Sequence, residues 1–298
     1  MRAKLKITCL LILTGVLDLS GHARAENCRT SPDRYCIGGQ PQNMPLKIYR
    51  NFLVVAKGRF GDAPGSENFI LDTGTAPSIV NIRVVRELGL ATTPSTFRAL
   101  GKSIPAQAAV IPEIELGPIR AFSVPVQVQD LSQLERDIGI PIAGIIGLDV
   151  LSKSSFLLDY DKKEIEFGGV SHAGVPVRFD PRAGIAVVEV RINGKGARFL
   201  VDTGSDRVVL FGGNFTEVGW LSLRDTSQSG ASLADRKMFI QVFSAADIIL
   251  GGQHFSDDRA YFVPGNADPV FDGLLGVRAL GFRALSYDQA AGTIYLGK

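Results

Sequence analysis

Two short stretches of sequence decide the fold, FILDTGT at residues 69–75 and FLVDTGS at residues 199–205. Each places three apolar residues before Asp-Thr-Gly and a small hydroxyl residue after it. The two aspartates, Asp72 and Asp202, lie 130 residues apart. An apolar run delivers the aspartate at the end of a strand, and the glycine two residues later permits a tight turn. Two copies of this pattern in 298 residues indicate an internal repeat.

Other segments recur at nearly the same spacing. IIG at residues 145–147 returns as LLG at residues 274–276, which is 129 positions later. FLLDYDKKEIEFG, beginning at Phe156, resembles ALSYDQAAGTIYLG, beginning at Ala284, and the segment 45–48 resembles 176–179. The chain is therefore expected to contain two homologous lobes, residues 45–170 and 171–298.

The pattern within each lobe is typical of β-structure. Apolar alternation and turn residues predict strands, which fall at residues 52–60, 69–72, 111–116 and 122–128, with a hairpin at 156–159 and 164–167. Many short strands separated by Gly and Pro predict an all-β fold of two β-barrel lobes. Facing each other about a pseudo-two-fold axis, with a cleft between them, the lobes would bring Asp72 and Asp202 together.

One helix is expected in the first lobe. Asn81 can cap its start, Val84, Val85 and Leu88 form an apolar stripe, and Gly89 ends it. The second lobe has FGG at residues 211–213 in the matching place, which predicts a shorter helix or none. Residues 167–183 are expected to connect the lobes.

The N-terminus has the pattern of a secretory signal peptide, residues 1–25. A basic start precedes the apolar run from Ile7 to Leu17, and Ala23 and Ala25 are small residues at the cleavage site. A membrane anchor is the alternative, but the run is about half of the ~20 residues needed to span a bilayer. No later segment predicts a span. The sequence thus predicts export to the periplasm or the exterior.

Residues 26–44 are rich in turn-forming residues and are expected to be an N-terminal extension. After cleavage, Cys28 and Cys36 are the remaining cysteines, and an oxidising compartment favours a disulfide between them. A zinc site is the alternative, although no further Cys or His cluster completes it. The extension could be a tethered tail or a pro-segment.

Composition excludes several classes of function. Hydrophobic residues make up 45% and charged residues 21%, as in a globular protein and not a disordered chain. Cleavage leaves 28 basic and 29 acidic residues, so nucleic acid is not an expected partner. His172 and His254 are the remaining histidines and lie far apart, so neither a metal site nor a cofactor is expected.

Paired carboxylates suggest a specific chemistry. Two carboxyl groups within a few Å do not both ionise readily, so one keeps its proton. The ionised carboxylate can take a proton from a water molecule while the protonated one donates to a substrate carbonyl. The activated water then attacks the carbonyl carbon, which is amide hydrolysis without a metal or covalent intermediate.

On these motifs, the chain resembles aspartic proteases of the pepsin and retroviral-protease superfamily, and in particular bacterial retropepsin-like proteases with both lobes fused in one chain. The resemblance covers residues 45–298 and implies a peptide or protein substrate. It implies that Asp72 and Asp202 are catalytic and that Thr75 and Ser205 support their outer oxygens. Thr73 and Thr203 would brace the lobes, with Gly74 and Gly204 completing the two loops. An active monomer is expected, and a homodimer with dyads formed between chains is the alternative.

The expected flaps depart from the usual pattern of the family. The β-hairpin flaps implied by the resemblance should fall near residues 97–109 and 226–238, but they lack the usual Tyr and are poor in Gly. A catalytically silent peptide-binding or protein-binding module is therefore the alternative to an endopeptidase. The remaining aspartates near the motifs, Asp149, Asp159 and Asp272, are assigned to caps and turns.

Overall fold

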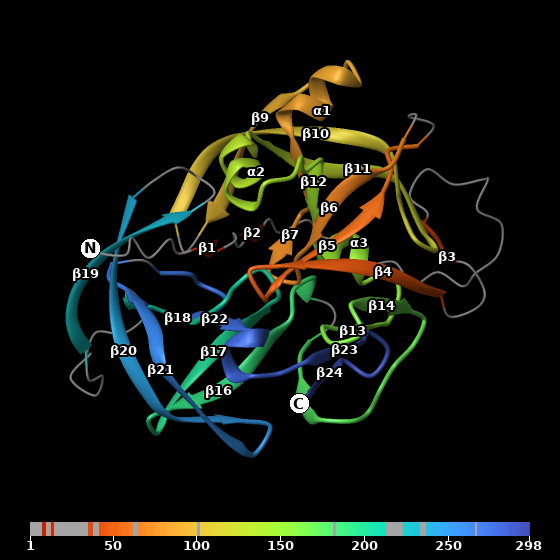
Figure 1. Ribbon diagram of the computed structural model, residues 1–298. Helices are drawn as coiled ribbons and strands as arrows, with labels where there is room; N and C mark the ends of the chain where they lie inside the picture. The colour runs from red at the N-terminus through yellow and green to blue at the C-terminus, as the bar shows by residue number, and fades with distance from the viewer. Residues whose placement is uncertain are drawn as a thin grey trace.

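The computed structural model describes residues 8–9, 13–14, 35–37, 42–61, 65–99, 102–180, 183–212, 223–232, 237–265 and 267–298. These residues form two β-lobes, one drawn from orange to yellow-green and the other from teal to blue in Figure 1. The all-β, two-lobed fold expected from the repeat is confirmed.

Lobe one is a strongly curved sheet of eight strands in the order β4-β5-β6-β12-β8-β11-β10-β9. Backbone hydrogen bonds between Arg59 and Glu115 join the end of β5 to β10, so the sheet folds back on itself. The bounds of its strands are β4 (Gln42–Tyr49), β5 (Leu53–Gly58), β6 (Glu67–Leu71), β8 (Ile79–Asn81), β9 (Thr93–Ala99), β10 (Lys102–Leu116), β11 (Ile119–Gln129) and β12 (Gly144–Ile146).

Lobe two contains a closed six-stranded barrel, in the order β16-β17-β22-β18-β21-β20, and β20 then pairs with β21 and β16. Strand β19 pairs with the outer part of β20. The bounds are β16 (Val187–Ile192), β17 (Lys195–Asp202), β18 (Val208–Phe211), β19 (Leu223–Ser232), β20 (Lys237–Leu250), β21 (Gln253–Val263) and β22 (Gly273–Gly276).

The same three-strand arrangement surrounds each Asp-Thr-Gly segment. In lobe one, β12 runs parallel to β6 and antiparallel to β8. In lobe two, β22 runs parallel to β17 and antiparallel to β18. The strand that ends in Ile-Ile-Gly or Leu-Leu-Gly is therefore inserted between the two strands that flank the aspartate.

A third set of strands joins the lobes. Its order is β15-β24-β23-β13-β14-β4, and β13 of lobe one pairs with β23 of lobe two at the centre (Figure 1). The bounds are β13 (Phe156–Asp159), β14 (Glu164–Phe167), β15 (Val175–Arg178), β23 (Ala284–Asp288) and β24 (Thr293–Gly297). The predicted hairpin at residues 156–167 is confirmed, and the predicted connector contains β15.

Burial of apolar side chains stabilises the two lobes together. One continuous core cluster includes Phe69 of lobe one and Phe199 of lobe two, both fully buried. At the shared sheet, the rings of Phe156 and Tyr287 stack across the lobes with centroids 5.2 Å apart. Because each buried aromatic or aliphatic side chain contributes about 1.5–3 kcal/mol, this shared core resists separation of the lobes.

The predicted helix of lobe one is α1 (Ile82–Glu87), and the side chain of Asn81 accepts a hydrogen bond from the backbone N–H of Arg83. Val84 and Val85 are buried as expected, but the prediction for Leu88 is wrong: it is 36% exposed. With six residues, α1 is too short for a full stripe to face the core. The other helical segments are α2 (Ser132–Ile138), α3 (Leu148–Leu151) and the 3-10 helix η3 (Val277–Leu280).

Three short N-terminal strands pair with the lobes. These are β1 (Thr8–Cys9) on β19, β2 (Leu13–Thr14) on β7 (Thr75–Ala76), and β3 (Tyr35–Ile37) on β11. Strand β4 begins at Gln42, within the expected extension. The predicted Cys28–Cys36 disulfide lies outside the described residues because Cys28 is not among them. Residues 213–222, where lobe two could have a counterpart of α1, also lie outside the described residues. Within the described part, no helix is long and apolar enough to cross a membrane.

Candidate active site

The two Asp-Thr-Gly loops meet at the junction of the lobes. Asp72 follows β6, Asp202 ends β17, and both side chains are completely buried. The loops approach so closely that a Cβ added at Gly74 would lie 2.6 Å from Cγ of Asp202. The structure thus brings together the two aspartates predicted from the repeat.

Each carboxyl group is held by the loop that carries it. Oδ1 of Asp72 accepts from the backbone N–H of Gly74 at 2.8 Å, and Oδ1 of Asp202 accepts from that of Gly204 at 2.7 Å. The outer oxygens differ: Oδ2 of Asp72 accepts from the Thr75 hydroxyl at 2.8 Å, whereas Oδ2 of Asp202 has no partner in the part of the chain that the structure describes. The dyad is therefore asymmetric.

The role expected for Ser205 is not the one that the structure shows. Its hydroxyl donates to the carbonyl oxygen of Arg207 at 3.0 Å, and the backbone N–H of Arg207 bonds back to it at 3.3 Å. A serine hydroxyl can satisfy its own local backbone in this way. Thr75 alone thus supports an outer carboxylate oxygen as expected.

Thr73 and Thr203 connect the lobes through four reciprocal hydrogen bonds. The backbone N–H of each threonine donates to the hydroxyl of the other, at 3.0 and 3.1 Å. The hydroxyl of Thr73 donates to the carbonyl of Val201 at 2.9 Å, and that of Thr203 donates to the carbonyl of Leu71 at 3.0 Å. Both threonines lie where the resemblance implies, and they fix the distance between the two aspartates.

Burial and mutual repulsion disfavour ionisation of the dyad. Burial is the main cause that raises the pKa of Asp72, and hydrogen bonds from Asp202, Thr75 and Gly74 oppose it. The pKa of Asp202 is raised well above its ordinary value of 3.8, first by burial and then by the charge of Asp72. Two buried carboxyl groups so close together do not both ionise readily, and the Thr75 hydroxyl favours the charged form of Asp72.

Glycines let the inserted strands approach the aspartate loops. A Cβ at Gly147 would lie 2.1 Å from the carbonyl oxygen of Thr75, and one at Gly276 would lie 2.5 Å from that of Ser205. In lobe one the contact is reinforced by Ser78, whose hydroxyl donates to Asp149 at 2.7 Å and accepts from the backbone N–H of Gly147 at 3.0 Å. Asp149 is therefore not the cap or turn residue expected from the sequence: its carboxylate accepts from Ser78 and anchors the strand beside Asp72.

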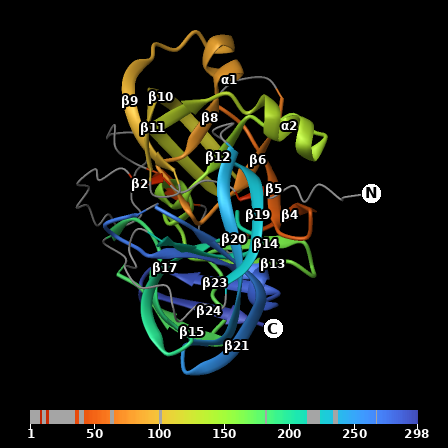
Figure 2. The same cartoon turned by 90° about the vertical axis from the view of Figure 1, so that its left-hand side faces the viewer.

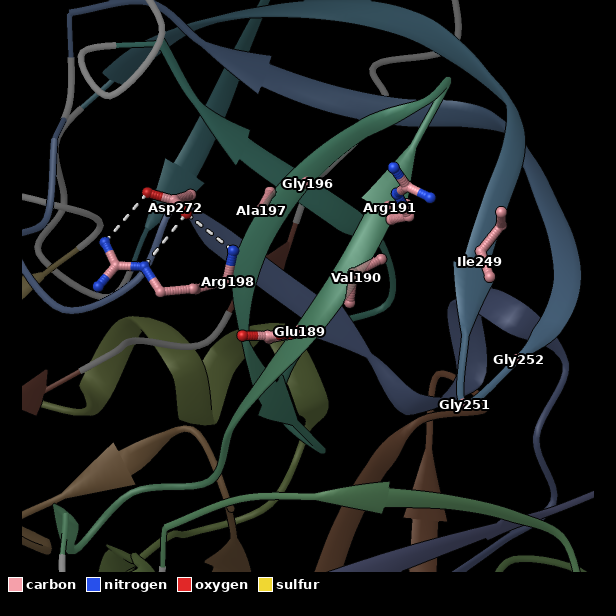
Figure 3. Close-up of a pocket in the computed structure, with 10 residues that line it drawn as sticks. All are labelled: Glu189, Val190, Arg191, Gly196, Ala197, Arg198, Ile249, Gly251, Gly252 and Asp272. Atoms are coloured by element: carbon pink, nitrogen blue, oxygen red, sulfur yellow. Dashed lines mark hydrogen bonds and ion pairs between the residues drawn. The ribbon is translucent and has the colours of Figure 1, made fainter.

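Asp159 has the local role expected of it, whereas the carboxylate of Asp272 bonds to a residue distant in sequence. Oδ1 of Asp159 accepts from the backbone N–H groups of Asp161 and Lys162, which closes the hairpin turn. Oδ2 of Asp272 accepts from the backbone N–H of Arg198 at 2.7 Å. Asp272 lines a hollow of about 530 Å³ on lobe two, shown in Figure 3, and neither Asp72 nor Asp202 lines that hollow.

One polar pair beside the dyad was not singled out from the sequence. Oδ1 of Asp206 and Nε of Arg207 are buried, and neither atom has a hydrogen-bond partner among the described residues. The matching positions in lobe one are Ala76 and Pro77. Comparing the residues that follow each Asp-Thr-Gly copy would have revealed this difference between the lobes.

Both predicted flap regions coincide with hairpins. The turn between β9 and β10 falls within residues 97–109, and the turn between β19 and β20 falls within residues 226–238. Strand β9 also contacts β2, which pairs with β7 directly after Gly74. The first hairpin therefore lies against β2, which is next to the segment that follows the Asp72 loop. Figure 2 shows β9, β10 and β11 side by side in the upper lobe.

Two β-lobes, a shared sheet and a buried pair of Asp-Thr-Gly loops define the class of aspartic proteases. The sequence agrees, since the profile of the aspartyl protease family matches residues 56–150 and 188–279. The chain belongs to this family, and each lobe contains one matched region. No curated protein shows significant sequence similarity to the chain.

Proposed function

We propose that this protein is an exported aspartic endopeptidase. The main observation behind this proposal is a buried pair of carboxyl groups with unequal surroundings. Asp72 accepts a hydrogen bond from a hydroxyl group, whereas Oδ2 of Asp202 has no hydrogen-bond partner among the described residues. Membership of the aspartyl protease family supports a peptidase. The basic and apolar N-terminus supports export to the periplasm or exterior, with cleavage after Ala25 and, in that compartment, a Cys28–Cys36 disulfide.

The unequal surroundings assign a role to each carboxyl group. Asp72 acts as the general base and takes a proton from a water molecule held between the two aspartates. That water attacks the carbonyl carbon of the peptide bond while Asp202 donates its proton to the carbonyl oxygen. In the resulting diol, Asp72 returns its proton to the leaving nitrogen, Asp202 recovers its own, and the C–N bond breaks.

An extended peptide is the proposed substrate. The chain's own segment β2 pairs with Thr75 and Ala76 and contacts β9. A substrate strand placed there would satisfy its backbone groups on the loop that follows Asp72. The shared core and the dyad within one chain support an active monomer.

Peptide cleavage by the mature protein, beginning at Glu26, tests the proposal. A diverse peptide library is incubated from acidic to neutral pH with the wild type, with Asp72→Asn and with Asp202→Asn. We expect turnover by the wild type that persists with a chelator and is lost in both variants, whose fold is checked by circular dichroism. Asp159→Asn is the control, because this carboxylate only closes a turn.

Three outcomes would contradict parts of the proposal. Turnover by the double variant Asp72→Asn/Asp202→Asn would exclude the dyad as its source. Binding of peptides without cleavage by the folded wild type would favour the silent binding module. Activity confined to a dimer in sedimentation experiments would contradict the active monomer.

A further inference from the structure

The hairpin formed by β9 and β10 carries an arginine close to its turn. Arg98 lies opposite Ser103, one position before the last pair, Ala99 and Lys102. Its neighbour Phe97 is 4% exposed and belongs to a core cluster of lobe one, so the hairpin is packed against that lobe close to its turn. The Arg98 side chain is 31% exposed. The hairpin thus presents a cation at its tip.

Lobe two presents a buried carboxylate to this arginine. Asp268 lies in the segment between β21 and β22, and its side chain is completely buried. Oδ1 accepts from the backbone N–H of Val270 at 2.9 Å, and Oδ2 accepts from Nη1 of Arg98 at 3.4 Å. The ion pair joins residues 170 positions apart, one in each lobe.

Because Asp268 is buried, breaking this ion pair costs more free energy than breaking a surface ion pair. A carboxylate removed from water is costly unless it is paired and hydrogen-bonded. With the hairpin in place, Asp268 is paired with Arg98. A hairpin that lifts must either expose Asp268 to water or leave it without this cation. The contact therefore favours the position of the hairpin seen here.

We propose that Arg98 and Asp268 form a cross-lobe latch that holds the end of the β9–β10 hairpin against lobe two and controls entry and release of the peptide. The proposal rests on the function proposed above, and both residues are positioning residues. The segment carrying Asp268 leads into β22, which pairs with β17 up to Asp202. The latch thus connects the hairpin of one lobe to the strand beside the aspartate of the other.

Hydrogen exchange on the full chain tests the latch without requiring activity. Amide exchange in β9 and β10 is compared in the wild type, Arg98→Met, Asp268→Asn and the double variant. We expect exchange near the turn to become at least about threefold faster in each single variant, because hairpin opening exposes these amides. The double variant should be no faster than the single ones, and Arg98→Lys should restore part of the protection.

The variants are chosen to keep the fold intact. Asn at position 268 keeps an oxygen for the Val270 N–H, and Arg98 is partly exposed. Arg120→Met is the matched control, since its ion pairs with Glu113 and Glu115 remain inside lobe one. Unchanged exchange near the turn in Arg98→Met and Asp268→Asn, or an equal change in Arg120→Met, would overturn the latch. Faster exchange in a protein that never cleaves peptides would uphold the latch and contradict the endopeptidase.

Discussion

At the scale of single residues, Gly74 leaves no room for a side chain beside Asp202. A Cβ there would meet Cγ of Asp202 at 2.6 Å and its Cβ at 3.1 Å, so the catalytic side chain itself would have to move. We expect Gly74→Ala to lower turnover at least about 100-fold, because misplacing a catalytic group by about 1 Å can have this cost. Steady-state kinetics on a cleaved peptide measures it.

Gly196→Ala is the control for that change. A Cβ at Gly196 would meet no atom within 4 Å. Its turnover and melting temperature should match those of the wild type. Full activity of Gly74→Ala would show that the two loops are farther apart in the working enzyme than in this structure.

Asp202 links the stability of the protein to pH. Its pKa is raised well above 3.8 in the fold, chiefly by burial, so the folded state holds a proton that the unfolded chain loses. Its contribution to stability is complete below the unfolded pKa and declines as pH rises toward the folded pKa. We therefore expect Asp202→Asn to raise the melting temperature by a few degrees at pH 7, and by much less at pH 3. An equal gain at both pH values in thermal unfolding would contradict this.

The same shift predicts how activity depends on pH. General acid catalysis requires the proton on Asp202, so turnover should decline with rising pH once that proton is lost. Because Asp202 keeps its proton above the ordinary range of a carboxyl group, activity should extend above pH 4. A pH profile of kcat/KM measures the effect. A rate that rises steadily to alkaline pH would contradict the acid role of Asp202.

The sequence predicts which residues meet at the site, but not every bond they make. The repeat predicted that Asp72 and Asp202 meet, and the family resemblance implied the bracing roles of Thr73 and Thr203. The hydrogen bond of Ser205 could not be predicted, because rotation about one side-chain bond decides whether its hydroxyl donates to Asp202 or to a nearby carbonyl. Such choices depend on the packing of residues distant in sequence.

At the scale of elements, the two Asp-Thr-Gly loops depend on one another. Replacing Thr73 by Val removes the hydroxyl that accepts from Thr203 and donates to Val201. Both partners are buried, and an unsatisfied buried group costs about 1–3 kcal/mol, so we expect a loss of roughly 2–4 kcal/mol in the free energy of unfolding. Urea unfolding measures it. Thr73→Ser keeps the hydroxyl and should lose less than about 1 kcal/mol, and an equal loss in both variants would contradict the bracing role.

Element boundaries were predicted where turn residues fix them. The hairpin at residues 156–167 and the strands at residues 111–116 and 122–128 were clear from local sequence, and strands occur there. The exposure of Leu88 and the pairing of β15 with β24 could not be predicted, since they depend on how neighbouring elements pack. Local patterns define the strands, whereas tertiary contacts decide which face of a short helix is buried.

At the scale of the whole molecule, two similar lobes share a sheet and a core, but the N-terminal residues pair with a different part of each lobe. Strand β1 pairs with Ala231 and Ser232 of lobe two, and β2 pairs with Thr75 and Ala76 of lobe one. Residues 8–9 therefore lie beside the hairpin of lobe two, and residues 13–14 lie beside the segment that follows the Asp72 loop. The substrate strand proposed above would occupy the same place as residues 13–14.

This placement predicts that the N-terminal segment, residues 1–25, inhibits the chain that carries it. A tethered segment acts at an effective concentration in the millimolar range, far above that of a micromolar substrate. We expect the chain that begins at Met1 to cleave a reporter peptide roughly tenfold or more slowly than the chain that begins at Glu26. A synthetic peptide of residues 8–14 added to the shorter chain should inhibit only at high concentration. Equal rates for the two chains would show that β2 leaves the site readily, and signal-peptide cleavage would then have no part in switching on activity.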